Sequence, residues 1–105
     1  MIQVRLHEGA IRDLREILDQ LSNDSERAVE QFYVELDAAA EFITRHPGAG
    51  HPCRRFRRWN FRKFPYHLIY IAPDGRGETW IMAVRHDRRH PGYGMRRRVP
   101  DPRIL

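Results

Sequence analysis

Residues 61–72, FRKFPYHLIYIA, carry the clearest strand pattern in the chain. Aromatic and aliphatic side chains recur at alternating positions, which is typical of a β-strand. Pro65 has no N–H to donate to a strand ladder, so we expect it at the start of the strand or at a bulge. One face of the predicted strand carries Phe64, Tyr66, Leu68 and Tyr70, and the other carries His67, Ile69 and Ile71.

Further strand patterns flank this segment on both sides. Pro73-Asp74-Gly75 predicts a hairpin turn after it. The next strand, Thr79 to Val84, is apolar on both faces, so we expect it to lie in the centre of a sheet. Upstream, the segment from Cys53 to Arg58 is short and basic, which favours an exposed or edge strand.

The N-terminal half of the chain begins with a short strand and continues with a helix. Residues 2–6, IQVRL, alternate between apolar and polar side chains and predict a strand with one buried face. After Gly9 the apolar period lengthens to three and four residues, which predicts an amphipathic helix. Its apolar positions are Ile11, Leu14, Leu18 and Leu21.

A second helix completes a helical hairpin. Asp24 or Ser25 is the expected N-cap, and the helix should end near Arg45, before the Pro47-Gly48 pair. The element order β-α-α-β-β-β predicts an α+β fold, with the helical hairpin packed on one face of a small, mostly antiparallel sheet. We expect residues 1–94 to form a single domain and residues 95–105 a loose basic tail. The apolar stripe of the second helix is Ala28, Val29, Phe32, Leu36, Ala39, Ala40 and Ile43.

Size and composition exclude several classes of protein. A chain of 105 residues and 12.6 kDa has room for one modest core, which excludes a large two-domain enzyme. The single Cys53 excludes an internal disulfide framework and favours a reducing, cytoplasmic location. No apolar run approaches the ~20 residues of a membrane span, so we expect no membrane partner.

Charge is distributed very unevenly along the chain. Residues 1–50 carry five arginines against ten acidic residues, whereas residues 51–105 carry thirteen arginines and one lysine against four acidic residues. The planar fork of arginine binds phosphate in a bidentate manner and stacks on bases. A polyanion or an acidic partner would explain a basic C-terminal half.

The first basic cluster, residues 54–63, interleaves cations with aromatic rings. Such a surface offers phosphate contacts together with stacking platforms, as nucleic-acid binding requires. Two alternatives remain open, namely a solvated edge strand protected by charge and a docking surface for an acidic partner segment. The cations of the cluster are Arg54, Arg55, Arg57, Arg58, Arg62 and Lys63.

The second cluster, residues 84–93, follows the predicted central strand. Histidine transfers protons near neutral pH, arginine stabilises phosphate charge, and tyrosine donates a proton or stacks on a base. This set would suit metal-free cleavage of a phosphodiester. Alternatively, His86 pairs with Asp87 or a backbone carbonyl while the arginines are solvated. No spacing of His, Cys or acidic residues predicts a metal site, and no glycine-rich loop predicts a nucleotide, so we expect no cofactor.

Three segments together resemble the RelE/ParE superfamily of bacterial type II toxins. They are residues 64–70, FPYHLIY, residues 81–86, IMAVRH, and residues 89–93, RHPGY. The helix bearing Ala28, Phe32 and Leu36 also resembles the superfamily, so that the similarity covers about residues 2–94. The resemblance implies the β-α-α-β-β-β fold, a cognate antitoxin with an acidic or amphipathic segment, a toxin–antitoxin hetero-oligomer, and growth inhibition by the free toxin.

The superfamily divides by target. RelE-like members cleave mRNA on the ribosome, and the resemblance places Arg58 and Tyr93 where that branch has a basic residue and the tyrosine. For that case we expect Arg58, Arg85 and Arg88 to stabilise phosphate charge, and His86 or Tyr93 to assist proton transfer. Asn60, His67 and Asp87 depart from that pattern because they stand where basic residues are usual.

The Phe-Pro-Tyr strand and the ending His86…Tyr93 look more like the ParE branch, whose members poison DNA gyrase. We therefore expect a cytoplasmic gyrase poison, with mRNA cleavage as the alternative and a non-toxic basic binding module as a third. The remaining residues expected to contact nucleic acid or a partner are Arg89, Arg96, Arg97 and Arg98.

Overall fold

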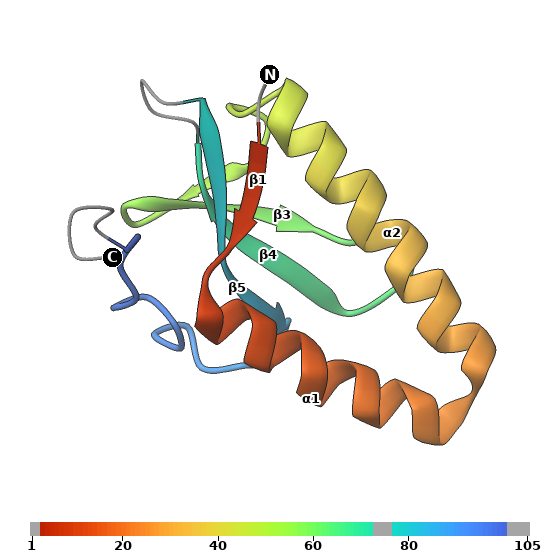
Figure 1. The fold of residues 1–105 in the computed structure, drawn as a ribbon. Coiled ribbons are helices and arrows are strands. Elements are labelled where there is room, and N and C mark those ends of the chain that lie inside the picture. Colours follow the sequence, from red (N-terminus) through yellow and green to blue (C-terminus); the bar gives the residue numbers. More distant parts are fainter. Residues whose placement is uncertain (1–2, 73–76, 101–105) are drawn as a thin grey trace.

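The computed structural model describes residues 3–72 and 77–100, in which two helices pack against one sheet (Figure 1). The helices meet at an acute angle and the sheet fills the space between them. The elements are β1 (Gln3–Leu6), α1 (Glu8–Asp24), α2 (Glu26–Arg45), β2 (His51–Cys53), β3 (Phe56–Asn60), β4 (Tyr66–Ile71) and β5 (Glu78–His86).

The sheet has five strands in the order β1-β5-β4-β3-β2. Only β1 and β5 are parallel, and the other neighbours are antiparallel. The α+β fold, with a helical hairpin on a mostly antiparallel sheet, is confirmed. The interior position of β5 is confirmed as well, because β1 and β4 flank it on its two sides.

The predicted edge strand from Cys53 to Arg58 is wrong in one respect. The chain turns at Arg54 and Arg55, so that β2 and β3 form a hairpin in which Cys53 pairs with Phe56. Phe56 is buried, and the turn lets its side chain enter the core while β2 becomes the sheet edge.

The strand predicted from residue 61 begins only at Tyr66, directly after Pro65, which confirms the expected place of the proline. The predicted turn at residues 73–75 lies outside the described residues.

The main core lies between the helices and the sheet. Phe32 of α2 is at its centre, and the rings of Phe61, Phe64 and Tyr66 meet it edge to face at 5.3–5.6 Å. This geometry suits the ring quadrupoles. The hydroxyl of Ser25 accepts a hydrogen bond from the N–H of Ala28, which makes Ser25 the N-cap of α2. The predicted apolar stripe of α2 is confirmed, since its members are buried or pack against this core.

The predicted apolar face of α1 is confirmed for Leu14, Leu18 and Leu21, which are buried or pack against the core, and it is wrong for one residue. Ile11 was expected in the core but is 40% exposed. The buried face also includes Ala10, Asp13 and Ile17, which were not predicted to lie in the core. The physical reason is Asp13, whose carboxylate accepts hydrogen bonds from groups on the sheet side and so fixes the rotation of the helix.

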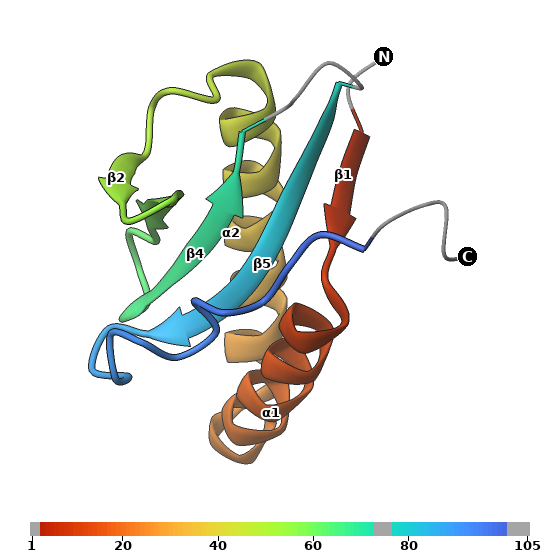
Figure 2. The same ribbon diagram turned by 90° about the vertical axis from the view of Figure 1, so that its left-hand side faces the viewer.

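After β5 the chain returns across the sheet face that is turned away from α2 (Figure 2). We call residues 91–100 the C-terminal strap. Met95 of the strap is buried in a second core with Phe56, Ile69 and Met82. The expectation of a loose tail from residue 95 is therefore wrong for the start of that segment, while residues 101–105 lie outside the described part of the chain.

Candidate functional site

A buried carboxylate connects α1, β5 and the C-terminal strap. Asp13 is 4% exposed, yet both of its oxygens have donors. The hydroxyl of Tyr93 donates to Oδ1 at 2.6 Å, and the backbone N–H of Val84 donates to Oδ2 at 3.2 Å. Arg97 completes the set with Nη1 to Oδ2 at 2.7 Å and Nη2 to Oδ1 at 3.3 Å. A bidentate pair of this kind stabilises strongly when it is shielded from water.

Arg97 is the positively charged partner of Asp13 in this contact. It also donates to the carbonyl oxygen of Met82 at 2.9 Å and to the Tyr93 hydroxyl at 3.1 Å. Burial alone would lower the pKa of Arg97, but the hydrogen bonds and charge of Asp13 and Tyr93 raise it above its ordinary value. Arg97 was predicted to contact a ligand, and the structure instead gives it internal partners.

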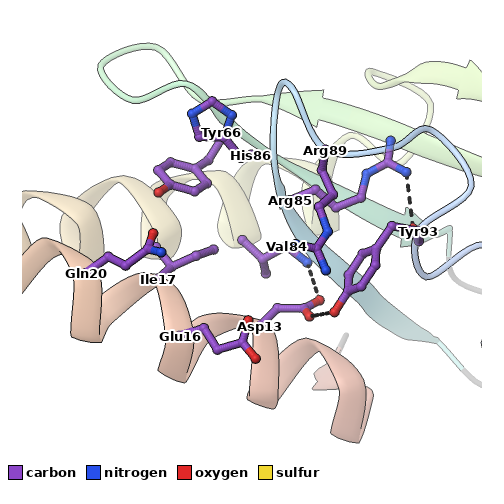
Figure 3. Close-up of a pocket in the computed structure, with 10 residues that line it drawn as sticks. All are labelled: Asp13, Glu16, Ile17, Gln20, Tyr66, Val84, Arg85, His86, Arg89 and Tyr93. Atoms are coloured by element: carbon purple, nitrogen blue, oxygen red, sulfur yellow. Dashed lines mark hydrogen bonds between the residues drawn. The ribbon is translucent and has the colours of Figure 1, made fainter.

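A cavity of about 280 Å³ lies beside this cluster, between α1 and the ends of β4 and β5 (Figure 3). The Arg89 guanidinium lies over the Tyr93 ring at 3.9 Å. The His86 ring meets Tyr66 edge to face at 5.1 Å, and its Nδ1 accepts the N–H of Arg88 at 3.0 Å. The lining residues are Asp13, Glu16, Ile17, Gln20, Tyr66, Val84, Arg85, His86, Arg89 and Tyr93.

A row of polar contacts crosses the other face of the sheet. Arg58 Nη2 lies 3.5 Å from Asp87 Oδ1, and the same oxygen lies 2.9 Å from His67 Nδ1. Arg85 Nε donates to His67 Nε2 at 2.9 Å. Because arginine only donates and a carboxylate only accepts, His67 must be neutral with its proton on Nδ1. Burial is the main cause that lowers the pKa of His67, and the charges of Arg58 and Arg85 lower it further against the opposing effect of Asp87.

Three further arginines, like Arg97, bind backbone carbonyls of the protein itself. Arg85 is 3% exposed and donates to the carbonyl oxygens of Pro91 at 2.8 Å and Tyr93 at 3.2 Å. Arg55 donates to the carbonyls of Met95 at 3.3 Å and Arg97 at 2.8 Å, which ties the β2–β3 turn to the strap. The third, Arg57, donates to Gly50 O at 2.8 Å. Arg85 was expected to stabilise phosphate charge, and Arg55 and Arg57 were expected to contact a ligand. In the structure the guanidinium groups of all three donate to internal acceptors.

Other predicted site residues keep their charged groups in solvent. Arg54, Arg88, Arg96 and Arg98 are exposed, and within residues 3–72 and 77–100 their side chains form no hydrogen bond or ion pair. Arg62 and Lys63 lie on the α2 side of the molecule, where their backbone N–H groups donate to the carboxylate of Glu35.

The candidate catalytic residues are thus only partly brought together. Arg85, His86 and Tyr93 line one cavity, whereas Arg58 does not line it and is linked to Arg85 through Asp87 and His67 in the polar row. The sequence analysis missed Asp13 altogether. A signal existed, because Asp13 falls in helical spacing with the apolar residues Ala10 and Ile17.

Neither a metal cluster nor a membrane span is found in the described part of the chain. Residues 3–72 and 77–100 hold no group of three His, Cys, Asp or Glu side chains that could bind a metal ion. Neither helix there has the length and apolar character that crossing a membrane requires.

Comparison with known proteins gives one family. Residues 4–91 match the model of the ParE toxin of the type II toxin–antitoxin system parDE. The match covers β1 to the turn after β5 and so includes Asp13 and the polar row. No curated protein matches the chain.

Proposed function

The chain belongs to the ParE toxin family of type II toxin–antitoxin systems, and we propose that it inhibits bacterial growth by poisoning DNA gyrase when it is free of its antitoxin. Membership of the family implies a cognate antitoxin as partner. The choice of gyrase over mRNA depends on how the protein uses Tyr93.

The hydroxyl of Tyr93 supports this choice because it is already engaged. A proton donor for RNA cleavage must reach the leaving oxygen of the substrate. Tyr93 instead donates to the buried Asp13 at 2.6 Å and accepts from Arg97 at 3.1 Å. Its ring is also flanked by the guanidinium groups of Arg89 and Arg97, at 3.9 and 5.0 Å.

Arg85 supports the same conclusion. An arginine that stabilises a phosphorane-like transition state must present its guanidinium to the substrate. Arg85 is 3% exposed and directs its donors to His67, Pro91 and Tyr93. Releasing it would leave buried acceptors unsatisfied, at a cost of about 1–3 kcal/mol each. A gyrase poison requires no such release.

Cleavage of mRNA remains the second candidate because of His86. Its Nδ1 is occupied by the N–H of Arg88, so that Nε2 is the nitrogen left for a ligand in the cavity. Arg89 lines the same cavity and carries a positive charge.

For the antitoxin we propose the exposed face of α2. Tyr33, Val34 and Phe42 are 48%, 69% and 41% exposed on this helix. Two cavities of about 460 and 290 Å³ share the lining residues Glu35, Ala38 and Arg62 and so form one groove along α2. An amphipathic segment would bury its apolar side there. The positive charges available to its acidic residues are Arg27, Arg62 and Lys63.

The sheet edge is a weaker candidate for the same partner. The edge strand β2 is three residues long and contains Pro52, which has no N–H for strand addition. Arg55 and Arg57 beside it already bind backbone carbonyls. The groove on α2 therefore fits an antitoxin better than the edge near residues 54–58.

The test of the target compares two activities of the same protein. We expect the purified toxin to make gyrase accumulate cleaved DNA and to leave ribosome-bound mRNA intact. Tyr93→Phe and His86→Ala should both retain growth inhibition, since no proton has to move. Two results together would favour mRNA over gyrase as the target. The parent chain would cleave mRNA at codon positions and leave gyrase unaffected, and both substitutions would abolish this cleavage in folded protein.

A further inference from the structure

The turn between β2 and β3 contains a residue in an unfavourable backbone conformation. Arg54 has φ of 57°, and it is the one residue other than glycine with positive φ in the described part of the chain. Cys53 pairs with Phe56, so that Arg54 and Arg55 form a two-residue hairpin loop. Positive φ at the first loop position alone is the pattern of a type II′ turn, where glycine is preferred. Arg54 therefore occupies this place at a cost in stability.

The side chain of Arg54 lines an open basic pocket on the strap side of the molecule. The pocket has a volume of about 560 Å³, and no acidic residue is among the described residues that line it. Arg96 supplies a second guanidinium from the strap. The lining residues are Arg54, His90, Gly92, Tyr93, Met95 and Arg96.

The side-chain donors of this pocket have no partner among the described residues. Neither Arg54 nor Arg96 forms a side-chain hydrogen bond or ion pair with residues 3–72 or 77–100, in contrast to Arg55 and Arg97 beside them. His90 Nδ1 accepts the N–H of Gly92 at 2.9 Å, which leaves the proton of the neutral ring on Nε2 as a further donor. Three sets of N–H donors without an acidic neighbour form a site for an anion.

We propose that Arg54, Arg96 and His90 bind the phosphate backbone of duplex DNA. A peptide partner needs apolar anchors, but the large exposed apolar side chains of the described residues, Ile11, Tyr33, Val34 and Phe42, all lie on the helices. Single-stranded nucleic acid needs exposed rings on which bases stack.

Of the two rings in the described lining, that of Tyr93 is covered by Arg89 and Arg97, and that of His90 is the small imidazole counted above as a donor. Duplex phosphates require positive charge alone and are bound without regard to sequence. This inference does not depend on gyrase being the target, because the site is defined by its own donors.

The experiment measures binding of a short fluorescent DNA duplex to the purified full chain by anisotropy, over a series of salt concentrations. Arg54→Gly and Arg96→Gln should each weaken binding about 5–10-fold at roughly 0.1 M salt and lower the slope of log K against log salt by about 0.9. Arg15→Gln is the matched control, since Arg15 is exposed on α1 and the substitution removes the same charge.

Arg54→Gly carries a second readout. Relief of the positive φ should raise the melting temperature by a few degrees even though binding is weakened. A melting temperature that falls would contradict the view that Arg54 is kept at a cost in stability. Absence of duplex binding at low salt, equal weakening by Arg15→Gln, or tighter binding of single strands than of the duplex would overturn the proposal. No gyrase is present in this assay, so its failure would leave the proposed target untouched.

Discussion

Asp13 in the first helix and Arg97 in the C-terminal strap lie 84 positions apart in sequence, and their side chains form an ion pair at 2.7 Å. The side chains are only 4% and 15% exposed, so the pair is shielded from water. It fixes the rotation of α1 and holds the strap against β5. The surface that displays Arg96 and Arg98 depends on this internal contact between two elements.

Removing the charge of Asp13 should destabilise the fold markedly. Asp13→Asn would leave the Arg97 guanidinium buried without its counter-charge, which typically costs about 3–5 kcal/mol. Urea unfolding monitored by circular dichroism measures the change. Asp19→Asn is the control, because Asp19 lies on the same helix with an exposed side chain. Equal midpoints for the two variants would contradict a stabilising role of the pair.

The effect of Gly9→Ala on the free energy of unfolding should depend on the residue at position 97. A Cβ built at Gly9 would overlap the guanidinium of Arg97. Gly9→Ala should therefore destabilise the parent chain by displacing Arg97 from Asp13. In an Arg97→Gln background the same change should stabilise by about 0.5–1 kcal/mol, the usual gain of alanine over glycine in a helix. A double-mutant cycle in urea measures this reversal, and additive effects would rule out the contact.

Stability should fall as the pH falls below the ordinary histidine pKa of 6.5. The pKa of His67 is lowered in the folded protein, so the unfolded chain binds its proton first and is favoured as the pH drops. Protonation of Nε2 would also remove the hydrogen bond from Arg85 and place a third positive charge beside Arg85 and Arg58. Urea midpoints at neutral and mildly acidic pH measure the effect.

The control for this pH dependence is His67→Gln. The pKa of His7 is lowered as well, chiefly by burial, and acts in the same direction. We therefore expect His67→Gln to reduce the loss of stability between neutral and acidic pH without abolishing it. An unchanged pH dependence in this variant would show that His67 does not contribute.

The arginines of the strap should separate into two functional groups. Arg96 and Arg98 are exposed, so Arg96→Glu and Arg98→Glu should change the free energy of unfolding by less than about 0.5 kcal/mol, as is usual for surface positions. Both should reduce growth inhibition if the strap contacts the target. Arg97→Glu should instead unfold the strap, because it would set two carboxylates against each other. Growth assays with matched soluble expression, together with urea unfolding, distinguish these outcomes.

The groove on α2 should be required for neutralisation. Val34→Gln removes an apolar side chain that is 69% exposed and lines the groove, so we expect weaker antitoxin binding with little change in stability. Ile11→Gln is the control, since Ile11 is 40% exposed on the other helix. Isothermal titration of toxin variants with the antitoxin measures the affinity. Equal losses for the two variants would place the antitoxin elsewhere.

The sequence alone determined the elements and their general arrangement, because local periodicity reports burial directly. Alternation over residues 66–71 predicts a strand, and apolar character on both faces of residues 79–84 predicts an interior strand. The stripe through Phe32 and Leu36 likewise requires one helix to face that sheet. The similarity of these same segments to ParE toxins was also visible without a structure, and the family match over residues 4–91 confirms it.

Only the tertiary structure decided which arginines serve the fold and which are left for a ligand. Arg54, Arg55, Arg96 and Arg97 are indistinguishable in the sequence. In the described part of the chain, however, Arg55 and Arg97 bind internal acceptors whereas Arg54 and Arg96 do not. The acceptors are backbone carbonyls and one carboxylate distant in sequence, and a carbonyl has no sequence signature because every residue carries one. The hydrogen bonds of a guanidinium are therefore fixed only when the strap, the sheet and α1 have come together.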